Sequence, residues 1–110
     1  MTLKEIENID FKKGDGVVPV IVQDSNSKDV LTLAYTNKES LELTKKTGNS
    51  WFWSRSRNKL WMKGEESGNT QKVKKILVDC DSDALIYLVE PSGPACHTGE
   101  QTCFHNDMNC

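Results

Sequence analysis

The amino-acid sequence predicts a single small α+β domain dominated by antiparallel strands, with one or two short helices. Its length of 110 residues is typical of one domain. Short segments rich in β-branched and aromatic residues recur along the chain and are separated by polar turns. One segment carries helix-capping residues and a closing glycine, whereas several segments are typical of strands.

The first elements are expected to be a lead-in and a strand pair. Residues 1–15 are polar and weakly patterned, so they form a helical or loose lead-in to an ordered body at residues 16–104. Segments 17–23 and 30–35 are rich in β-branched residues, which favour strands. The polar run DSNSKD between them suits a hairpin turn.

A short helix is expected after this strand pair. Thr36, with Glu39 three positions later, matches a capping box, and Gly48 is suited to the helix end. Beyond the helix the pattern returns to strands, and residues 105–110 form a tail. The further strand-like segments are 50–56, 59–62, 72–79 and 85–90.

Composition and charge narrow the class of protein. Hydrophobic residues make up 36% of the chain and charged residues 27%, as in ordinary soluble globular proteins. The net charge of −2 argues against nonspecific nucleic-acid binding by the whole surface. No apolar run could span a bilayer or act as a signal peptide, so a cytoplasmic location without membrane partners is expected. So small a core also favours association between copies of the chain.

Three of the four cysteines, Cys80, Cys96 and Cys103, lie in polar surroundings. Thiols stay reduced in the cytosol, so metal ligands or free thiols are expected rather than disulfides. Cys80 stands between two aspartates, and Cys96 opens the run CHTG. No C-x-x-C pair is present, and ordinary buried thiols are the alternative interpretation. Three thiolates on a tetrahedral zinc would leave one position open to water, as in catalytic zinc sites.

The run DCDSD around Cys80 suggests a second kind of metal site. If residues 78–83 are extended, Asp79, Asp81 and Asp83 project from one face and Cys80 from the other. Carboxylate oxygens suit magnesium, whereas thiolates suit zinc, so one segment could serve two metals. The alternative is a solvated acidic turn.

The segment 51–71 combines positive charge with small polar residues and tryptophans. Such a combination is typical of an anion site for a phosphorylated aromatic molecule, although a solvated basic face and core-packing tryptophans are the alternatives. The residues expected to bind the substrate are Arg55, Arg57, Lys63, Ser67 and Asn69.

The runs WSRSRNKLWMKGEESGNTQKV, VDCDSDALIYLV and GPACHTGEQTCF resemble, in this order, motifs of the phosphoribosyl-AMP cyclohydrolase family, and the resemblance covers about residues 16–104. It implies a zinc-dependent hydrolase of histidine biosynthesis that opens the adenine ring of phosphoribosyl-AMP between N1 and C6. It also implies an intertwined homodimer with one zinc per subunit. The implied zinc ligands, shared across the dimer, are Cys80, Cys96 and Cys103, and the implied magnesium ligands are Asp79, Asp81 and Asp83.

Other residues take roles that follow from these expectations. His97 adjoins an expected zinc ligand, and histidine is the residue type that ordinarily changes charge near neutral pH, so it is the candidate general acid or base. Support of the loop by hydrogen bonding is its alternative role. His105 is expected to be a bystander, and Cys110 a free terminal thiol. Some family members carry a fused phosphoribosyl-ATP pyrophosphohydrolase domain, and this chain is expected to be the single-activity form.

A different class of function stays open at this point. The chain could be a non-catalytic zinc module whose basic strand binds RNA or a nucleotide. Such a module needs a fourth protein ligand on zinc, for which His97 and His105 are the candidates, whereas the enzyme needs that position open to water.

Overall fold

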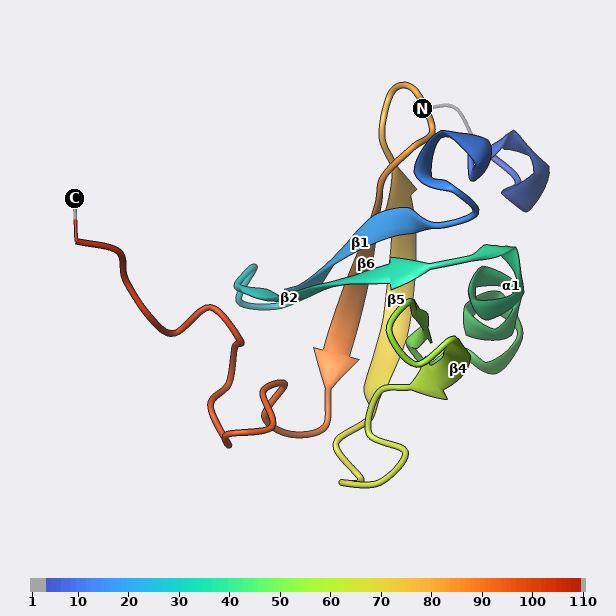
Figure 1. Cartoon of the computed structure of the whole chain (residues 1–110). Coiled ribbons are helices and arrows are strands. Elements are labelled where there is room, and N and C mark those ends of the chain that lie inside the picture. Colours follow the sequence, from blue (N-terminus) through green and yellow to red (C-terminus); the bar gives the residue numbers. More distant parts are fainter. Residues whose placement is uncertain (1–3, 110) are drawn as a thin grey trace.

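The structure, a computed structural model, describes residues 4–109, which form two β-sheets and one α-helix (Figure 1). The larger sheet has the strand order β2-β1-β6-β5, and the smaller sheet pairs β3 with β4. The elements are η1 (Ile6–Asn8), η2 (Lys12–Gly14), β1 (Val18–Asp24), β2 (Val30–Thr36), α1 (Lys38–Thr47), β3 (Trp51–Ser54), β4 (Lys59–Met62), β5 (Gln71–Val78) and β6 (Leu85–Pro91).

The strand pairings confirm the predicted α+β class with mostly antiparallel strands. β1 pairs with β2, β3 with β4 and β5 with β6 in antiparallel fashion, whereas β1 and β6 run parallel. The predicted strand pair corresponds to β1 and β2. Their connecting turn is held by buried Asp24, whose Oδ1 accepts a hydrogen bond from the backbone N–H of Asn26 at 2.8 Å.

Helix α1 begins one residue later than its predicted capping box. Its N-cap is Asn37, whose Oδ1 accepts from the Ser40 N–H at 2.8 Å, while Ser40 Oγ accepts from the Asn37 N–H at 2.8 Å. The predicted cap, Thr36, is instead the last residue of β2 and is fully buried. Gly48 ends the helix in a left-handed conformation, as predicted. Within residues 4–109, no helix is long and apolar enough to cross a membrane.

The core lies on one face of the larger sheet. Alternate residues of β1, Val18, Val20 and Val22, are almost completely buried, as expected for a strand with one face inward. Phe52 of β3 packs against Tyr87 of β6, with ring centroids 5.8 Å apart, so the β3–β4 hairpin covers this face. Figure 1 shows α1 and β4 on one side of β6, whereas the C-terminal segment leaves the body on the other side.

The opposite face of the larger sheet carries a row of apolar side chains across all four strands. Ile21 pairs with Leu33 on one side and with Ile86 on the other, and Ile86 pairs with Leu77. We call Leu33, Ile21, Ile86 and Leu77 the outer apolar row. Leu33 keeps 46% of its surface exposed and Ile21 keeps 36%. Exposed apolar side chains in a continuous row are typical of a surface that another molecule covers.

Candidate functional site

The segment between β5 and β6 is a tight turn, which is the alternative that the sequence left open to an extended segment. The Asp79 N–H donates to the Ala84 carbonyl at 3.1 Å, which closes the turn, and Ser82 has a left-handed φ of 63°. Asp79 Oδ1 accepts hydrogen bonds from the N–H groups of Asp83 at 2.9 Å and Ala84 at 3.2 Å. The alternative interpretation of an acidic turn is confirmed for the backbone, and the extended alternation over residues 78–83 does not occur, because the antiparallel strands β5 and β6 must be joined by a reversal here.

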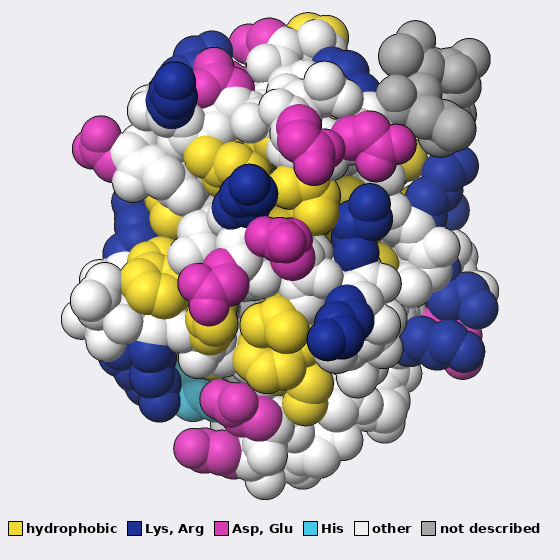
Figure 2. Space-filling model, turned by 90° about the vertical axis from the view of Figure 1, so that its right-hand side faces the viewer, with side chains coloured by type: hydrophobic (Ala, Val, Ile, Leu, Met, Phe, Trp, Pro, Cys, Tyr) yellow, Lys and Arg dark blue, Asp and Glu magenta, His cyan; other side chains and the backbone are white. Residues whose placement is uncertain are grey.

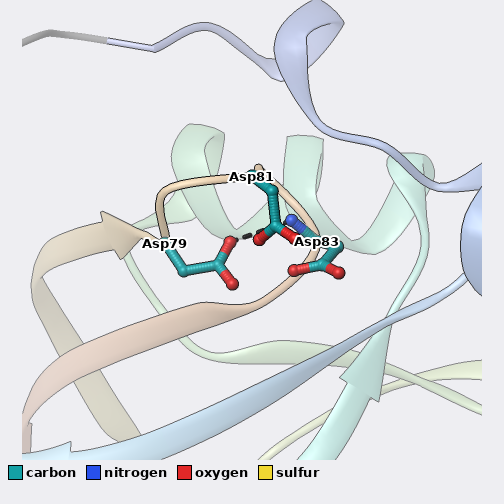
Figure 3. A group of neighbouring side chains, drawn as sticks. All are labelled: Asp79, Asp81 and Asp83. Carbon is teal, nitrogen blue, oxygen red and sulfur yellow. Dashed lines mark hydrogen bonds between the residues drawn. The ribbon is translucent and has the colours of Figure 1, made fainter.

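The turn nevertheless brings the three predicted carboxylates together. Figure 3 shows the side chains of Asp79, Asp81 and Asp83 pointing toward one another. One carboxylate oxygen from each residue lies within 4.8 Å of the other two. The curled backbone therefore produces the cluster that an extended strand was expected to produce. Three hard oxygen donors at this spacing could hold a magnesium ion.

Two lysines of the N-terminal segment reach this acidic turn. Lys13 Nζ lies 2.8 Å from Asp83 Oδ2 and 3.3 Å from Asp81 Oδ2. Hydrogen bonds to Asp83 and Asp81 raise the pKa of Lys13, and the hydrogen bond from Lys13 lowers the pKa of Asp83 to about 2. Desolvation, followed by the neighbouring Asp83 carboxylate, raises the pKa of Asp79. Lys4 Nζ donates to the Ser82 hydroxyl at 2.6 Å.

Two of the predicted zinc ligands lie on the loop after β6. Cys96 opens this loop, and its N–H donates to the Glu100 carbonyl at 3.1 Å. The Cys103 N–H donates to the Leu31 carbonyl at 2.7 Å, and the Thr102 hydroxyl donates to the Val30 carbonyl at 2.6 Å. These bonds hold the cysteine loop, residues 95–104, against the start of β2.

Cys96 is buried among groups that stabilise its thiolate. The Thr98 hydroxyl donates to Cys96 Sγ at 3.1 Å, and His105 Nε2 lies 3.9 Å from the same sulfur. The hydrogen bonds from Thr98, followed by those from His105 and Cys103, lower the pKa of Cys96 to about 6. His105, which was expected to be a bystander, thus lies beside Cys96, and whether it has a role stays a prediction.

Cys80 lies apart from the other two cysteines within one chain. It is exposed on the β5–β6 turn before β6 begins, whereas Cys96 and Cys103 follow the end of β6 (Figure 1). β6 has seven residues, so it separates the two ends by roughly 20 Å at about 3.3 Å per residue. One copy of the chain does not bring the three predicted zinc ligands together, and the predicted Cys110 thiol lies outside the described residues.

A hollow of about 460 Å³ opens beside the cysteine loop. Among the predicted substrate residues, Arg57, Lys63 and Ser67 line it, and so does His97. Lys63 Nζ also donates to the Ala95 carbonyl, so this side chain links the hollow to the start of the cysteine loop. The hollow therefore combines the positive charges of Arg57 and Lys63 with hydroxyl donors and the candidate acid or base. The carboxylates of Glu65 and Glu66 also line it.

A second hollow, of about 570 Å³, adjoins the first, since both are lined by Ser54, Ser56 and Trp61. Arg55 lines it, and the guanidinium carbon of Arg55 lies 3.8 Å from the centre of the Tyr35 ring. Asn69 lines neither hollow. Its side chain occupies the space where a Cβ on Gly93 would stand. The structure thus divides the predicted anion-binding residues between two neighbouring hollows and leaves Asn69 out of both.

Comparison with known proteins places these features in a family. Residues 32–105 match the family model described as "Phosphoribosyl-AMP cyclohydrolase". The "Phosphoribosyl-AMP cyclohydrolase" of Nitrosopumilus maritimus (strain SCM1) is 77% identical over 105 residues, which cover 96% of this chain and 97% of that protein. The protein of that name from Clostridium botulinum (strain 657 / Type Ba4) is 58% identical over 109 residues, covering 98% of this chain and 99% of that one.

A longer relative also matches. The "Histidine biosynthesis bifunctional protein HisIE" of Bacillus subtilis (strain 168) is 62% identical over 106 residues, which cover 96% of this chain and 50% of that protein. The matched segment of the family model includes both hollows, the acidic turn and the cysteine loop. The chain therefore belongs to the phosphoribosyl-AMP cyclohydrolase family, as the resemblance of its motifs predicted.

Proposed function

We propose that the protein hydrolyses the N1–C6 bond of the adenine ring of phosphoribosyl-AMP in histidine biosynthesis. The observation that carries the proposal is the position of His97. This side chain lines the first hollow together with Arg57 and Lys63, while its neighbour Cys96 lies in the cysteine loop beside His105. A candidate metal ligand and a candidate acid or base thus meet at a hollow suited to a phosphorylated substrate.

The donor atoms fit the two implied metals. Cys96 is stabilised as a thiolate, which is the form that binds zinc. The three aspartates offer clustered hard oxygens, and the Lys13 ammonium already acts as a stand-in cation beside two of them. Zinc, when bound, would supply a water that is acidified enough to act as a nucleophile near neutral pH. Magnesium would help to orient the substrate phosphates or the surrounding water.

Ring opening requires proton transfers that His97 can provide. Water adds to C6, the C6–N1 bond breaks, C6 becomes a carboxamide carbon and N1 takes up a proton. A group near the hollow must therefore accept a proton from the attacking water and deliver one to N1. His97 is exposed, lines the hollow and adjoins Cys96, so it can reach the reacting atoms without leaving its loop.

The two hollows suit the two phosphate-bearing halves of this substrate. Both the phosphoribosyl group and the AMP group carry a phosphate. We assign one phosphate to the hollow with Arg57 and Lys63, and the other to the hollow with Arg55. Trp61 lines both hollows, so its ring is placed to contact the base between them. Ser67 adds a hydroxyl donor to the first hollow, whereas a role for Asn69 stays a prediction.

The zinc site needs a second copy of the chain. Cys80 lies at one end of β6, and Cys96 and Cys103 lie beyond the other end. A two-fold axis perpendicular to the middle of β6 reverses the strand, so the Cys80 end of one copy meets the Cys96 end of the other. The outer apolar row crosses the sheet at Ile86, near the middle of β6, and supplies a surface for this contact. A homodimer with two shared zinc sites follows.

The proposal is tested by an ultraviolet assay of phosphoribosyl-AMP turnover. The metal-loaded protein is expected to hydrolyse the substrate, and a strong chelator is expected to stop it. The Cys96→Ser variant is expected to lose turnover and zinc while its circular dichroism stays that of the parent. Near-full turnover by a folded Cys96→Ser variant would exclude the zinc site.

One observation favours the alternative of a closed, non-catalytic zinc module. His105 Nε2 lies 3.9 Å from Cys96 Sγ, so His105 could supply a fourth protein ligand. Such a module would lose zinc in the His105→Ala variant and would not turn over phosphoribosyl-AMP. The enzyme is expected to retain zinc on its three thiolates in this variant. Figure 2 shows acidic and basic side chains intermixed on the face that it presents, which gives RNA no continuous basic surface there.

A further inference from the structure

The acidic turn is neutralised by the chain's own N-terminal segment. Lys13 Nζ lies within ion-pair distance of Asp81 and Asp83, two of the three clustered carboxylates. We propose that Lys13 is an internal cation that occupies the divalent-cation site of the metal-free protein, and that a bound magnesium or manganese ion displaces it. The inference rests on the proposed metal role of the acidic turn. It adds that the Lys13 ammonium competes with the metal ion for that site.

The N-terminal segment is built onto the turn. The Asp10 N–H donates to the Ser82 carbonyl at 2.8 Å, which joins the segment to the turn through the backbone. The Lys13 N–H donates to Asp10 Oδ1 at 3.2 Å and fixes the start of the short helix η2. Ile9, between η1 and η2, keeps only 8% of its surface exposed, so it anchors the segment in the core. Lys13 therefore stands beside the carboxylates as part of the fold.

Lys13 and a divalent cation compete for the same oxygen atoms. A magnesium ion requires carboxylate oxygens at about 2.0 to 2.1 Å. The Lys13 ammonium takes up one oxygen each of Asp81 and Asp83, and these residues belong to the three-oxygen cluster. Two cations at such short range repel each other, so the ammonium must withdraw when the ion binds.

Lys4, in the same segment, also contacts the acidic turn but does not bond its carboxylates. Its Nζ donates to the Ser82 hydroxyl and to the carbonyl oxygens of Asp79 and Cys80. None of these is a carboxylate oxygen, so metal binding leaves these bonds in place. The exchange is thus confined to Lys13, and the rest of the N-terminal segment stays attached to the turn. A singly charged residue holds the site until a doubly charged ion replaces it.

The test measures metal binding and not turnover. Manganese is titrated into the zinc-loaded protein and followed by electron paramagnetic resonance, for the parent and for the Lys13→Met and Lys12→Met variants. Lys12 is the matched control, because it lies on the same short helix and the change removes the same charge. The dissociation constant is expected to fall about fivefold in Lys13→Met, which corresponds to the upper range for exposed ion pairs, and less than about twofold in Lys12→Met.

A second readout uses the unaltered protein. The NMR signal of the Lys13 side-chain ammonium is expected to move toward that of Lys12 when magnesium binds, because Lys13 leaves its ion pairs with Asp81 and Asp83. Equal manganese affinity in the Lys13→Met and Lys12→Met variants, or an unchanged Lys13 ammonium signal on magnesium binding, would overturn the inference.

The Asp81→Asn variant separates this inference from the proposed function. Loss of manganese binding in Asp81→Asn, together with tighter binding in Lys13→Met, supports both proposals. If Asp81→Asn loses manganese binding but Lys13→Met and Lys12→Met bind manganese equally well, only the proposed role of Lys13 is excluded. Full manganese binding by Asp81→Asn removes the metal site at the turn, and the exchange at Lys13 with it.

Discussion

At the scale of single residues, the neighbours of Cys96 stabilise the charged form of its thiol. The Thr98 hydroxyl donates to the sulfur at 3.1 Å, and the pKa of Cys96 falls to about 6 as a result. A hydrogen bond to the charged form of an acid lowers its pKa, so the thiolate predominates at neutral pH before any metal arrives. At the proposed zinc site, an incoming zinc ion would therefore have no proton to displace from Cys96.

Replacing Thr98 tests this account. The Thr98→Val variant removes the donor, so the pKa of Cys96 is expected to rise toward the ordinary cysteine value of about 8.5. In metal-free protein, alkylation of Cys96 by iodoacetamide, followed by peptide mass spectrometry, should be half-maximal near pH 6 in the parent and at higher pH in the variant. The control is Thr102→Val, because the Thr102 hydroxyl donates to the Val30 carbonyl and not to sulfur. Equal pH profiles for Thr98→Val and the parent would contradict the role of Thr98.

At the scale of elements, the loop between β4 and β5 forms one wall of the first hollow. The path of its backbone depends on a glycine. Gly64 has a φ of 85°, and a Cβ there would lie 2.5 Å from the backbone nitrogen of Thr70. Gly68 has a similar φ of 83°, yet a Cβ there would meet no atom within 4 Å. The two glycines share the left-handed backbone but differ in the space around them.

This difference gives a matched pair of variants. Gly64→Ala and Gly68→Ala both place alanine at positive φ, so the strain from φ is similar in both. Gly64→Ala must in addition displace backbone, and its free energy of unfolding is expected to be lower than that of Gly68→Ala by about 1 to 3 kcal/mol. Urea denaturation measures this difference. The KM for phosphoribosyl-AMP is expected to rise in Gly64→Ala, and equal stability of the two variants would show that the loop can move aside.

The elements also show how far sequence alone could go. Strands β1, β2 and β6 were predictable because alternating or continuous apolar residues mark them locally. The start of α1 was predicted one residue early, since both Thr36 and Asn37 are capping residue types and only the end of β2 decides between them. At residues 79–84 the sequence left an extended segment and an acidic turn open, because a D-x-D-x-D run alone does not show that the next strand reverses direction.

In the candidate site, too, local sequence motifs could be recognised, whereas contacts between distant segments could not. Arg57 and His97 lie inside recognisable motifs, and the structure brings both to the first hollow, while their roles stay predictions. Lys13 was missed because its partner Asp81 lies 68 positions away in the chain, and only tertiary structure brings them together. The position of His105 was missed because it depends on how the chain leaves the cysteine loop.

At the scale of the whole molecule, the separation of Cys80 from Cys96 leads to a complementation test. Cys80→Ser and Cys96→Ser chains are each expected to be inactive alone, since each damages every zinc site. A mixed dimer contains one doubly damaged site and one intact site, so equal coexpression should restore about one quarter of the parent activity under random pairing. Activity is measured by phosphoribosyl-AMP turnover, and size-exclusion chromatography together with mass spectrometry confirms the mixed dimers. Mixed dimers without recovered turnover would exclude a zinc site shared between chains.

The length of strand β6 also sets the distance between the segments at its two ends. Its seven residues separate the acidic turn from the cysteine loop, and in the proposed dimer this length sets the distance between the two zinc sites. An insertion of two residues would keep every side chain on its own face of the sheet yet lengthen the strand by about 6.6 Å. The core would tolerate such a change at the strand end better than the proposed zinc sites, because each proposed site is completed by the far end of the partner's strand. The proposed dimer therefore implies that the chemistry at the two ends of β6 constrains its length, and that a family member with a longer β6 would compensate in one of the two loops.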